Sequence, residues 1–232
     1  MKKVKARRED GGQVRYIRAI NSNTIVFCHG PAGSGKTHIA AGMAATSLNK
    51  ANSGVKRIIV CRPVVDCGQS IGFLPGTIED KLGPYMAPMF DELTYYYEPE
   101  DIFGMMQKKI IEMVPLSMMR GRTFNDCYVI CDEAQNATED ELKMLLTRLG
   151  QNSKMLLIGD AAQSDMPGHH FSRVSRLMGG IEDIAVVHMD KSDIVRHKLV
   201  GKILTAFEED AITPPVAVND YSDYEEDEDY DA

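Results

Sequence analysis

The chain has 232 residues, 44% of them hydrophobic, and a formal net charge of −8. This length suits one well-buried α/β domain better than two small ones. No apolar run approaches the roughly 18 residues of a membrane span, and no apolar stretch follows the basic start of the chain, as a secretory signal requires. We therefore expect a cytoplasmic protein without membrane contact.

Most of the negative charge lies at the end of the chain. Residues 219–232 hold eight acids and no Lys or Arg, so the rest of the chain is neutral overall. Because this segment has little apolar surface to bury, we expect 210–232 to be a disordered acidic tail. It either keeps the protein soluble or competes with nucleic acid for a basic surface. Residues 1–12 are expected to form a basic arm, either solvated or in contact with phosphates.

Apolar, β-branched segments recur along the body of the chain. Thr24–His29 is typical of a buried parallel strand. Further strands are predicted at 57–62, 127–132, 155–159 and 184–189, with helices between them. This alternation predicts an α/β fold with a parallel sheet and helices on both faces.

Two helices have N-terminal signals, and one region breaks the alternation. The capping box Thr138-Glu-Asp-Glu141 predicts a helix that ends at Gly150. Residues 64–121, rich in Gly, Pro and Met, are predicted to be an inserted loop followed by helices near 79–97 and 101–113. Ser192 is expected to cap a last helix with five inward-facing residues: Ile194, Val195, Leu199, Ile203 and Leu204.

The cysteines match no zinc-site spacing. We interpret Cys28, Cys61 and Cys131, which fall in or beside predicted strands, as reduced core residues.

The segment after the first strand fits the pattern G-x-x-x-x-G-K-[ST] at every fixed position. Glycines let successive N–H groups point at one anion, and the N-terminus of the following helix adds partial positive charge. Lys36 would reach the β- and γ-phosphates, and the Thr37 hydroxyl would bind Mg²⁺. The pattern therefore predicts a nucleotide-binding loop of eight residues: Gly30, Pro31, Ala32, Gly33, Ser34, Gly35, Lys36 and Thr37.

Two carboxylates lie at the end of the strand predicted at 127–132. Asp132 is predicted to hold Mg²⁺, and Glu133 to orient and deprotonate the water that attacks the γ-phosphate. The alternative is a pair of solvated acids at a strand end. A later strand ends at Gly159-Asp-Ala-Ala-Gln163, where Gln163 is placed to contact the γ-phosphate or the water. Upstream, Gln13 is expected either to read the adenine edge through its amide or to be a surface residue.

These motifs occur together with less general ones. They include Arg62-Pro-Val-Val, Ile71-Gly-Phe-Leu-Pro-Gly76, Arg120-Gly-Arg-Thr123, Asp132-Glu-Ala-Gln-Asn136, Leu146-Thr-Arg-Leu-Gly150 and Asp193-Ile-Val-Arg-His197. Over roughly residues 13–209 the chain resembles the PhoH-like ATPases. The resemblance implies one RecA-like P-loop NTPase domain related to superfamily 1 helicase cores, ATP and Mg²⁺ as cofactors, and single-stranded RNA or DNA as partner. It also assigns Arg62 to nucleotide binding.

The chain departs from the family pattern in three ways. We expect no nuclease or RNA-binding domain, Pro167–Phe171 replaces an expected Ser-Gly-Leu stretch, and the acidic tail is added. Compact members of the family are frequent in bacteriophages, with which a phage origin would agree.

An ATPase that acts on nucleic acid is the leading hypothesis. The alternatives are a small-molecule or nucleotide kinase, which has no need of Glu133 because its substrate replaces water, and a non-hydrolysing switch. Since one domain leaves no second domain to supply an arginine, we expect a homo-oligomer, most simply a hexameric ring. Arg196 is the first choice for the arginine that completes the neighbour's catalytic site, with Arg122 and Arg148 as alternatives.

Overall fold

A computed structural model describes residues 4–6, 11–63, 78–164, 167–195, 199 and 203. Contacts divide the chain into two units, Met1–Val195 and Arg196–Ala232. The helices of the first unit are α1 (Gly12–Ser22), α2 (Lys36–Leu48), α3 (Ile78–Leu93), α4 (Pro99–Gln107), α5 (Glu139–Leu146) and α6 (His170–Met178). Its strands are β1 (Ile25–His29), β2 (Arg57–Arg62), β3 (Ile111–Pro115), β4 (Cys127–Cys131), β5 (Lys154–Gly159) and β6 (Ile184–His188).

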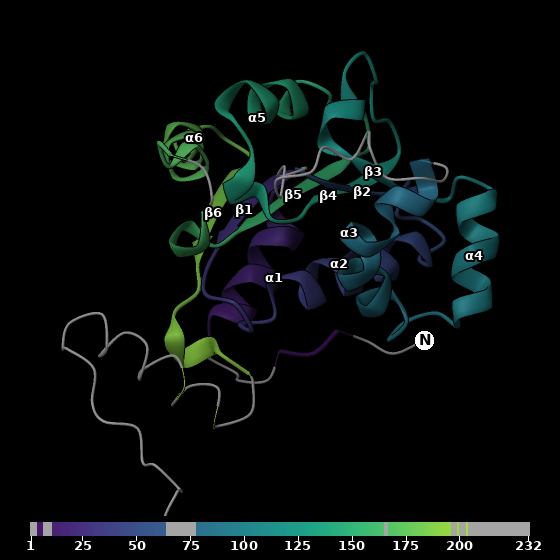
Figure 1. The fold of residues 1–232 in the computed structure, drawn as a ribbon, viewed down its shortest axis with the longest axis horizontal. Helices are drawn as coiled ribbons and strands as arrows, with labels where there is room; N and C mark the ends of the chain where they lie inside the picture. The colour runs from purple at the N-terminus through teal and green to yellow at the C-terminus, as the bar shows by residue number, and fades with distance from the viewer. Residues whose placement is uncertain are drawn as a thin grey trace, which may run out of the picture. The chain divides into compact units, whose positions relative to one another are not determined.

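The strands form one sheet in the order β3-β2-β4-β5-β1-β6, and every neighbouring pair is parallel (Figure 1). β5 therefore lies between β1, which leads into the phosphate loop, and β4, which leads into Asp132. Because all strands run the same way, their carboxyl ends meet along one edge of the sheet, where open α/β folds bind ligands. The predicted parallel sheet is confirmed.

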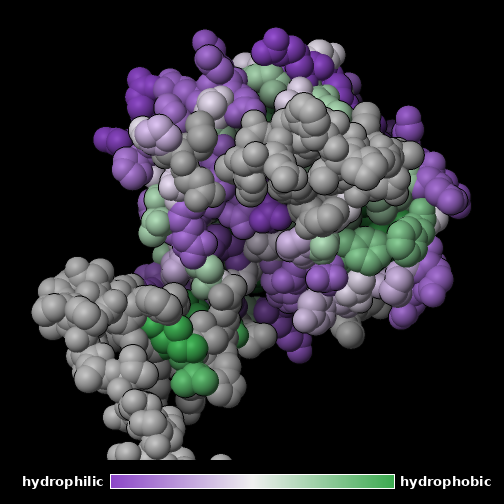
Figure 2. All heavy atoms as spheres, in the orientation of Figure 1, coloured by the Kyte–Doolittle hydropathy of each residue, from purple (hydrophilic) through white to green (hydrophobic). Residues whose placement is uncertain are grey.

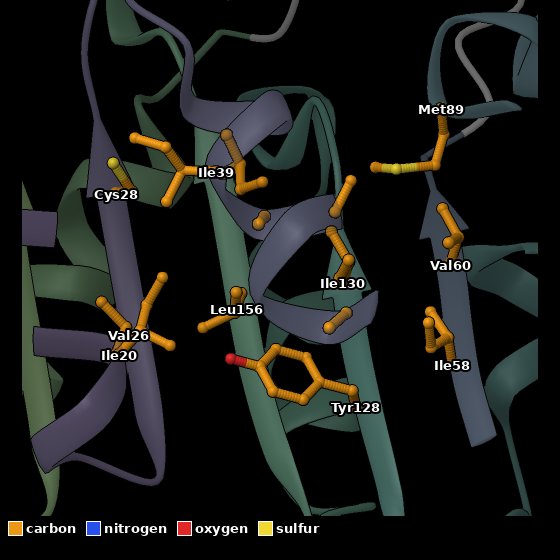
Figure 3. Packing of buried hydrophobic residues seen from close by; sticks show 14 of the residues in the cluster. Ile20, Val26, Cys28, Ile39, Ile58, Val60, Met89, Tyr128, Ile130 and Leu156 are labelled. Atoms are coloured by element: carbon orange, nitrogen blue, oxygen red, sulfur yellow. The ribbon is translucent and has the colours of Figure 1, made fainter. Parts of the chain in front are cut away.

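Helices cover both faces of the sheet: α1 to α4 lie on one face, and α5 and α6 on the other (Figure 1). Side chains alternate between two buried clusters because successive residues of a strand point to opposite faces. Val26 and Cys28 of β1 pack with Ile39 of α2 on the first face (Figure 3). Phe27, between them, packs on the second face with Phe171 of α6. The interpretation of Cys28, Cys61 and Cys131 as core residues is confirmed, since all three are buried and unpaired.

The predicted strands are found within one residue at each end. The capping box is also confirmed: the Thr138 hydroxyl accepts from the Glu141 N–H, and the Glu141 carboxylate accepts from the Thr138 N–H. The helix α5 ends earlier than predicted, at Leu146.

The helix predicted near 101–113 is wrong beyond Gln107. Lys109 has a positive φ of 54°, which stops the helix, and Ile111–Pro115 forms the edge strand β3 beside β2. An edge position tolerates Pro115, which has no N–H to donate. Helix α1 was not expected at all.

The start predicted for the last helix is also wrong. Asp190, and not Ser192, caps a single 3₁₀ turn at Lys191–Asp193, and Ile194 is extended. In the second unit the two described residues, Leu199 and Ile203, are helical but exposed. The predictions for 64–77 and for the acidic tail lie outside the described residues, and the domain boundaries stay predictions. No helix within the described ranges is both long and apolar enough to span a membrane.

Candidate functional site

The phosphate loop joins β1 to α2 with the backbone that the pattern requires. Gly33 and Gly35 have φ values of 83° and 84°, a left-handed conformation that side chains disfavour. The loop is anchored to the neighbouring strand, because the Gly30 N–H donates to the Gly159 carbonyl oxygen at 3.2 Å. Lys36 and Thr37 begin α2, so the free N–H groups of this helix end face the loop.

Lys36 is 8% exposed, and its ammonium is held by its own loop. Its Nζ donates to the carbonyl oxygens of Gly30 at 2.6 Å and Pro31 at 2.9 Å. Burial lowers the pKa of Lys36, while the negative charges of Asp160, Glu133 and Asp132 oppose that shift. Lys36 therefore lies near three carboxylates that follow β4 and β5.

Thr37 and Asp132 meet across the site. The Thr37 Oγ1 donates to Asp132 Oδ1 at 3.2 Å. The adjacent oxygens of an octahedral Mg²⁺, with bonds of 2.0–2.1 Å, lie about 2.9 Å apart, so this oxygen pair fits that ion directly or through a water. Burial, then the neighbouring Glu133, raises the pKa of Asp132 to about 6. A divalent cation would relieve that unfavourable charge.

Glu133 follows Asp132 with a left-handed backbone, φ 52°. Both of its carboxylate oxygens are engaged: Arg62 Nη2 donates to Oε1 at 3.0 Å, and Gln135 Nε2 donates to Oε2 at 2.6 Å. Arg62, assigned to nucleotide binding, thus lies beside Glu133 in this structure.

The turn after β5 is the predicted γ-phosphate sensor. Asp160 caps a 3₁₀ turn at Ala161–Gln163, and the Gln163 side chain is exposed. Gln135 links this turn to Glu133, because its Oε1 accepts from the Asp160 N–H at 3.0 Å. Our sequence reasoning gave Gln135 no role; the only signal was an amide two residues after the predicted base.

Gln13 lies on α1 against the phosphate loop. It is 6% exposed, and its Nε2 donates to the Ser34 carbonyl oxygen at 2.9 Å. A Cβ on Gly35 would lie 2.8 Å from that nitrogen, so this glycine also leaves room for Gln13. The alternative of a surface residue is therefore wrong, and the role of Gln13 toward adenine stays a prediction.

The segment after β6, residues 189–195, holds α1 and the phosphate loop together. The buried Asp193 accepts from the Gly12 N–H at 2.7 Å through Oδ1 and from the Asp190 N–H at 3.1 Å through Oδ2. The Val195 N–H donates to the Gly33 carbonyl oxygen at 2.9 Å. Sequence reasoning missed Asp193, because its partner Gly12 is 181 residues away.

The three arginines considered for a neighbour's site differ in their surroundings. Arg122 pairs with Glu112 at 2.7 Å and lies over the Phe124 ring, 5.1 Å from its centroid, so local contacts hold it. Arg148 donates to the Thr147 hydroxyl at 3.2 Å. Arg196 lies outside the described residues.

The sequence around this site is similar to those of known proteins. The family model for PhoH-like proteins matches residues 4–208. The chain belongs to this family. A PhoH-like protein of Synechocystis sp. is 42% identical over 208 residues, which cover 88% of this chain and 63% of the relative. A PhoH-like protein of Bacillus subtilis is 44% identical, with 85% and 62% covered. Protein PhoH of Escherichia coli K12 is 39% identical, with 84% and 56% covered.

This PhoH-like chain thus spans 56 to 63% of the length of these curated relatives. Among solved structures, it is similar to the large terminase of a thermophilic bacteriophage, with a TM-score of 0.54, 10% identity, and coverage of 84% of this chain and 49% of that one. That likeness concerns the fold alone. Together with the family, it confirms the predicted P-loop NTPase fold, and membership implies nucleotide binding.

Proposed function

We propose that this PhoH-like protein binds Mg·ATP and hydrolyses it. One observation carries the proposal: Thr37 of the phosphate loop is bonded to Asp132, and Glu133 follows directly at the same edge of the sheet. Thr37 and Asp132 would hold the metal, which would neutralise phosphate charge. Lys36 would exchange its bonds to the loop carbonyls for the β- and γ-phosphates, and Glu133 would orient and deprotonate the water.

The same arrangement favours hydrolysis over the alternatives. A kinase of this fold transfers phosphate to its substrate and typically does not need a Glu beside the Asp that holds the metal, whereas here Glu133 is held by two donors. A non-hydrolysing switch would not require those two donors either.

We further propose that hydrolysis in the cytoplasm drives action on single-stranded RNA or DNA, with subunits arranged in a ring. The nucleic-acid path is not the hydrophobic area over α3 and α4 in Figure 2. Phe103 of α4 is 57% exposed, with its ring centroid 5.3 Å from that of Phe90 of α3. Helices α3 and α4 and the segment between them also carry four exposed acids that would repel phosphates: Asp91, Glu98, Glu100 and Asp101.

Phosphate release from ATP by the whole chain tests both proposals. With Mg²⁺ we expect hydrolysis that single-stranded RNA or DNA accelerates, and a Lys36→Ala variant that keeps its fold but loses turnover. Turnover of that variant within about threefold of wild type would overturn the site. If neither single-stranded RNA nor single-stranded DNA changes the rate of hydrolysis, the proposed nucleic-acid partner is contradicted. Transfer of the labelled γ-phosphate from ATP to a nucleotide or small molecule would favour the kinase.

A further inference from the structure

Gln135 is the most deeply placed polar side chain beside the candidate base. It is 2% exposed and belongs to the 3₁₀ turn Ala134–Asn136 that follows β4. Its Nε2 donates to Glu133 Oε2, and its Oε1 accepts from the Asp160 N–H. The orientation of the amide is fixed by chemistry, because only the –NH₂ group can donate to a carboxylate and only the carbonyl oxygen can accept from an N–H.

Glu133 itself has little else to hold it. Its side chain is 37% exposed, so without partners it would sample several rotamers. Arg62 fixes one oxygen from the end of β2, and Gln135 fixes the other from within the core. Because hydrogen bonds to ionised groups are about twice as strong as neutral ones, these two contacts set the direction in which the carboxylate points.

Gln135 also contacts the turn that follows β5, through its side chain at Asp160 and through its backbone at Ser164. The Ser164 hydroxyl donates to the backbone carbonyl oxygen of Gln135 at 3.0 Å. A Cβ on Gly159 would lie 2.9 Å from Gln135 Oε1, so a glycine at this point leaves room for the amide. Gln135 therefore bridges two strands, β4 and β5, at the edge where the carboxylates gather.

We propose that Gln135 is a positioning residue for hydrolysis, which aims the Glu133 carboxylate at the attacking water and ties that aim to the turn Asp160–Ser164. The inference rests on the proposed function. Any shift of this turn when the γ-phosphate binds would reach Glu133 through one side chain. Because Gln135 is buried and both ends of its amide are bonded to protein, it should act on the rate of the chemical step and not on nucleotide binding.

The test compares Gln135→Met, which keeps the volume but removes both bonds, with Ser153→Ala as matched control. Ser153 is also buried and also bridges β4 and β5, but at their opposite ends, where its hydroxyl accepts from the Cys127 N–H and donates to the Phe124 carbonyl oxygen. For Gln135→Met we expect kcat to fall about 10- to 100-fold, the scale of imperfect general-base geometry. KM and the Kd for Mg·ADP should change less than about threefold.

Two further measurements, hydrogen exchange and a double mutant, test the contact in addition to the kcat of the single variant. Without nucleotide, the Asp160 amide should exchange its hydrogen faster in Gln135→Met and at the wild-type rate in Ser153→Ala. In a Glu133→Gln background, Gln135→Met should slow hydrolysis no further. Should Gln135→Met not fold, Gln135→Asn keeps an amide too short to span both partners, and the same results are expected.

Several results would overturn the proposal. They are wild-type kcat in the variant, faster hydrolysis, a parallel loss of nucleotide affinity, or full additivity with Glu133→Gln. If Lys36→Ala and Glu133→Gln lose turnover as expected but Gln135→Met keeps the wild-type kcat, this inference is wrong and the proposed function stands. Absence of hydrolysis by the wild-type chain would end the proposed function, and this inference with it.

Discussion

At the scale of single residues, Arg62 and Gln135 hold Glu133, the residue to which we assign the role of general base. We predict that Glu133→Gln binds Mg·ATP like the wild type but hydrolyses it at least about 100-fold more slowly, the typical scale for losing a general base. The amide keeps the size of the side chain and removes only the basic oxygen. Single-turnover hydrolysis and equilibrium binding of a fluorescent nucleotide measure the two quantities. A collapse of affinity with unchanged chemistry would make Glu133 a ligand instead of the base.

His29 gives a second prediction, on stability. Its ring is buried, lies 4.3 Å from the Phe171 ring, and its Nε2 lies 2.8 Å from the Ser175 hydroxyl. Burial, and next the neighbouring His188, lowers the pKa of His29 to about 4. Because the unfolded chain binds this proton near pH 6.5, the stability from His29 is complete above that pH and is lost as pH falls towards 4. The loss should be about 2 to 3 kcal/mol.

The measurement is the free energy of unfolding in urea at several pH values, for wild type and His29→Gln. The raised pKa of Asp132 makes the free energy of unfolding increase as pH falls through this range, which opposes the effect of His29. Asp132 is present in both proteins. The difference between the two proteins therefore isolates His29. A wild-type stability that falls no more steeply than that of His29→Gln between pH 6.5 and 4 would contradict the prediction.

At the scale of elements, the segment 189–195 fixes α1 against the phosphate loop, and Asp193 is its main contact. We predict that Asp193→Ala lowers the free energy of unfolding by about 1 to 3 kcal/mol, because a charge-assisted bond to a helix N-terminus is lost. It should also weaken nucleotide binding several-fold, since α1 carries Gln13 to the loop. Thermal unfolding and nucleotide titration measure both effects.

Glu141→Ala is the matched control, because Glu141 is also an acid that caps a helix N-terminus, on the other face of the sheet. It should lower stability and leave nucleotide affinity unchanged. Equal loss of affinity in both variants would mean that the segment 189–195 has no specific link to the site.

Sequence reasoning succeeded where local chemistry decides the structure. The apolar strands, the glycines of the phosphate loop and the capping box at Thr138 each report on neighbours within a few residues. It failed where distant contacts decide. Strand β3 is short and forms only because β2 supplies its hydrogen bonds, and Glu112 within it pairs with Arg57 and Arg122. Helix α1 begins at Gly12 because Asp193 accepts its first N–H, a pairing that no local pattern contains.

At the scale of the whole molecule, two arginines that the sequence connects with the nucleotide or with a neighbour's site are held by acids of their own chain. Arg62 pairs with Glu133, and Arg122 with Glu112. Because Arg62 and Arg122 have these local partners, Arg196 stays our first choice, with Arg148 second, for the guanidinium that completes the catalytic site of a neighbouring subunit. A guanidinium so placed is typically worth about 10³-fold or more in rate.

Mixing two inactive variants tests the ring. We expect Lys36→Ala and Arg196→Ala each to lose turnover, the first because it cannot hold phosphate and the second because it cannot complete its neighbour's site. In mixed rings some interfaces pair an intact phosphate loop with an intact arginine, so activity should partly return. The control is a mixture of Lys36→Ala with Glu133→Gln. Each of these changes damages the site of the subunit that carries it, and Arg196 is intact in both variants. Every site in the mixed rings is therefore defective, and activity should stay lost. If light scattering shows co-assembly but ATPase activity does not return, Arg196 acts within its own chain. A monomer with full ATPase activity would contradict the proposed ring.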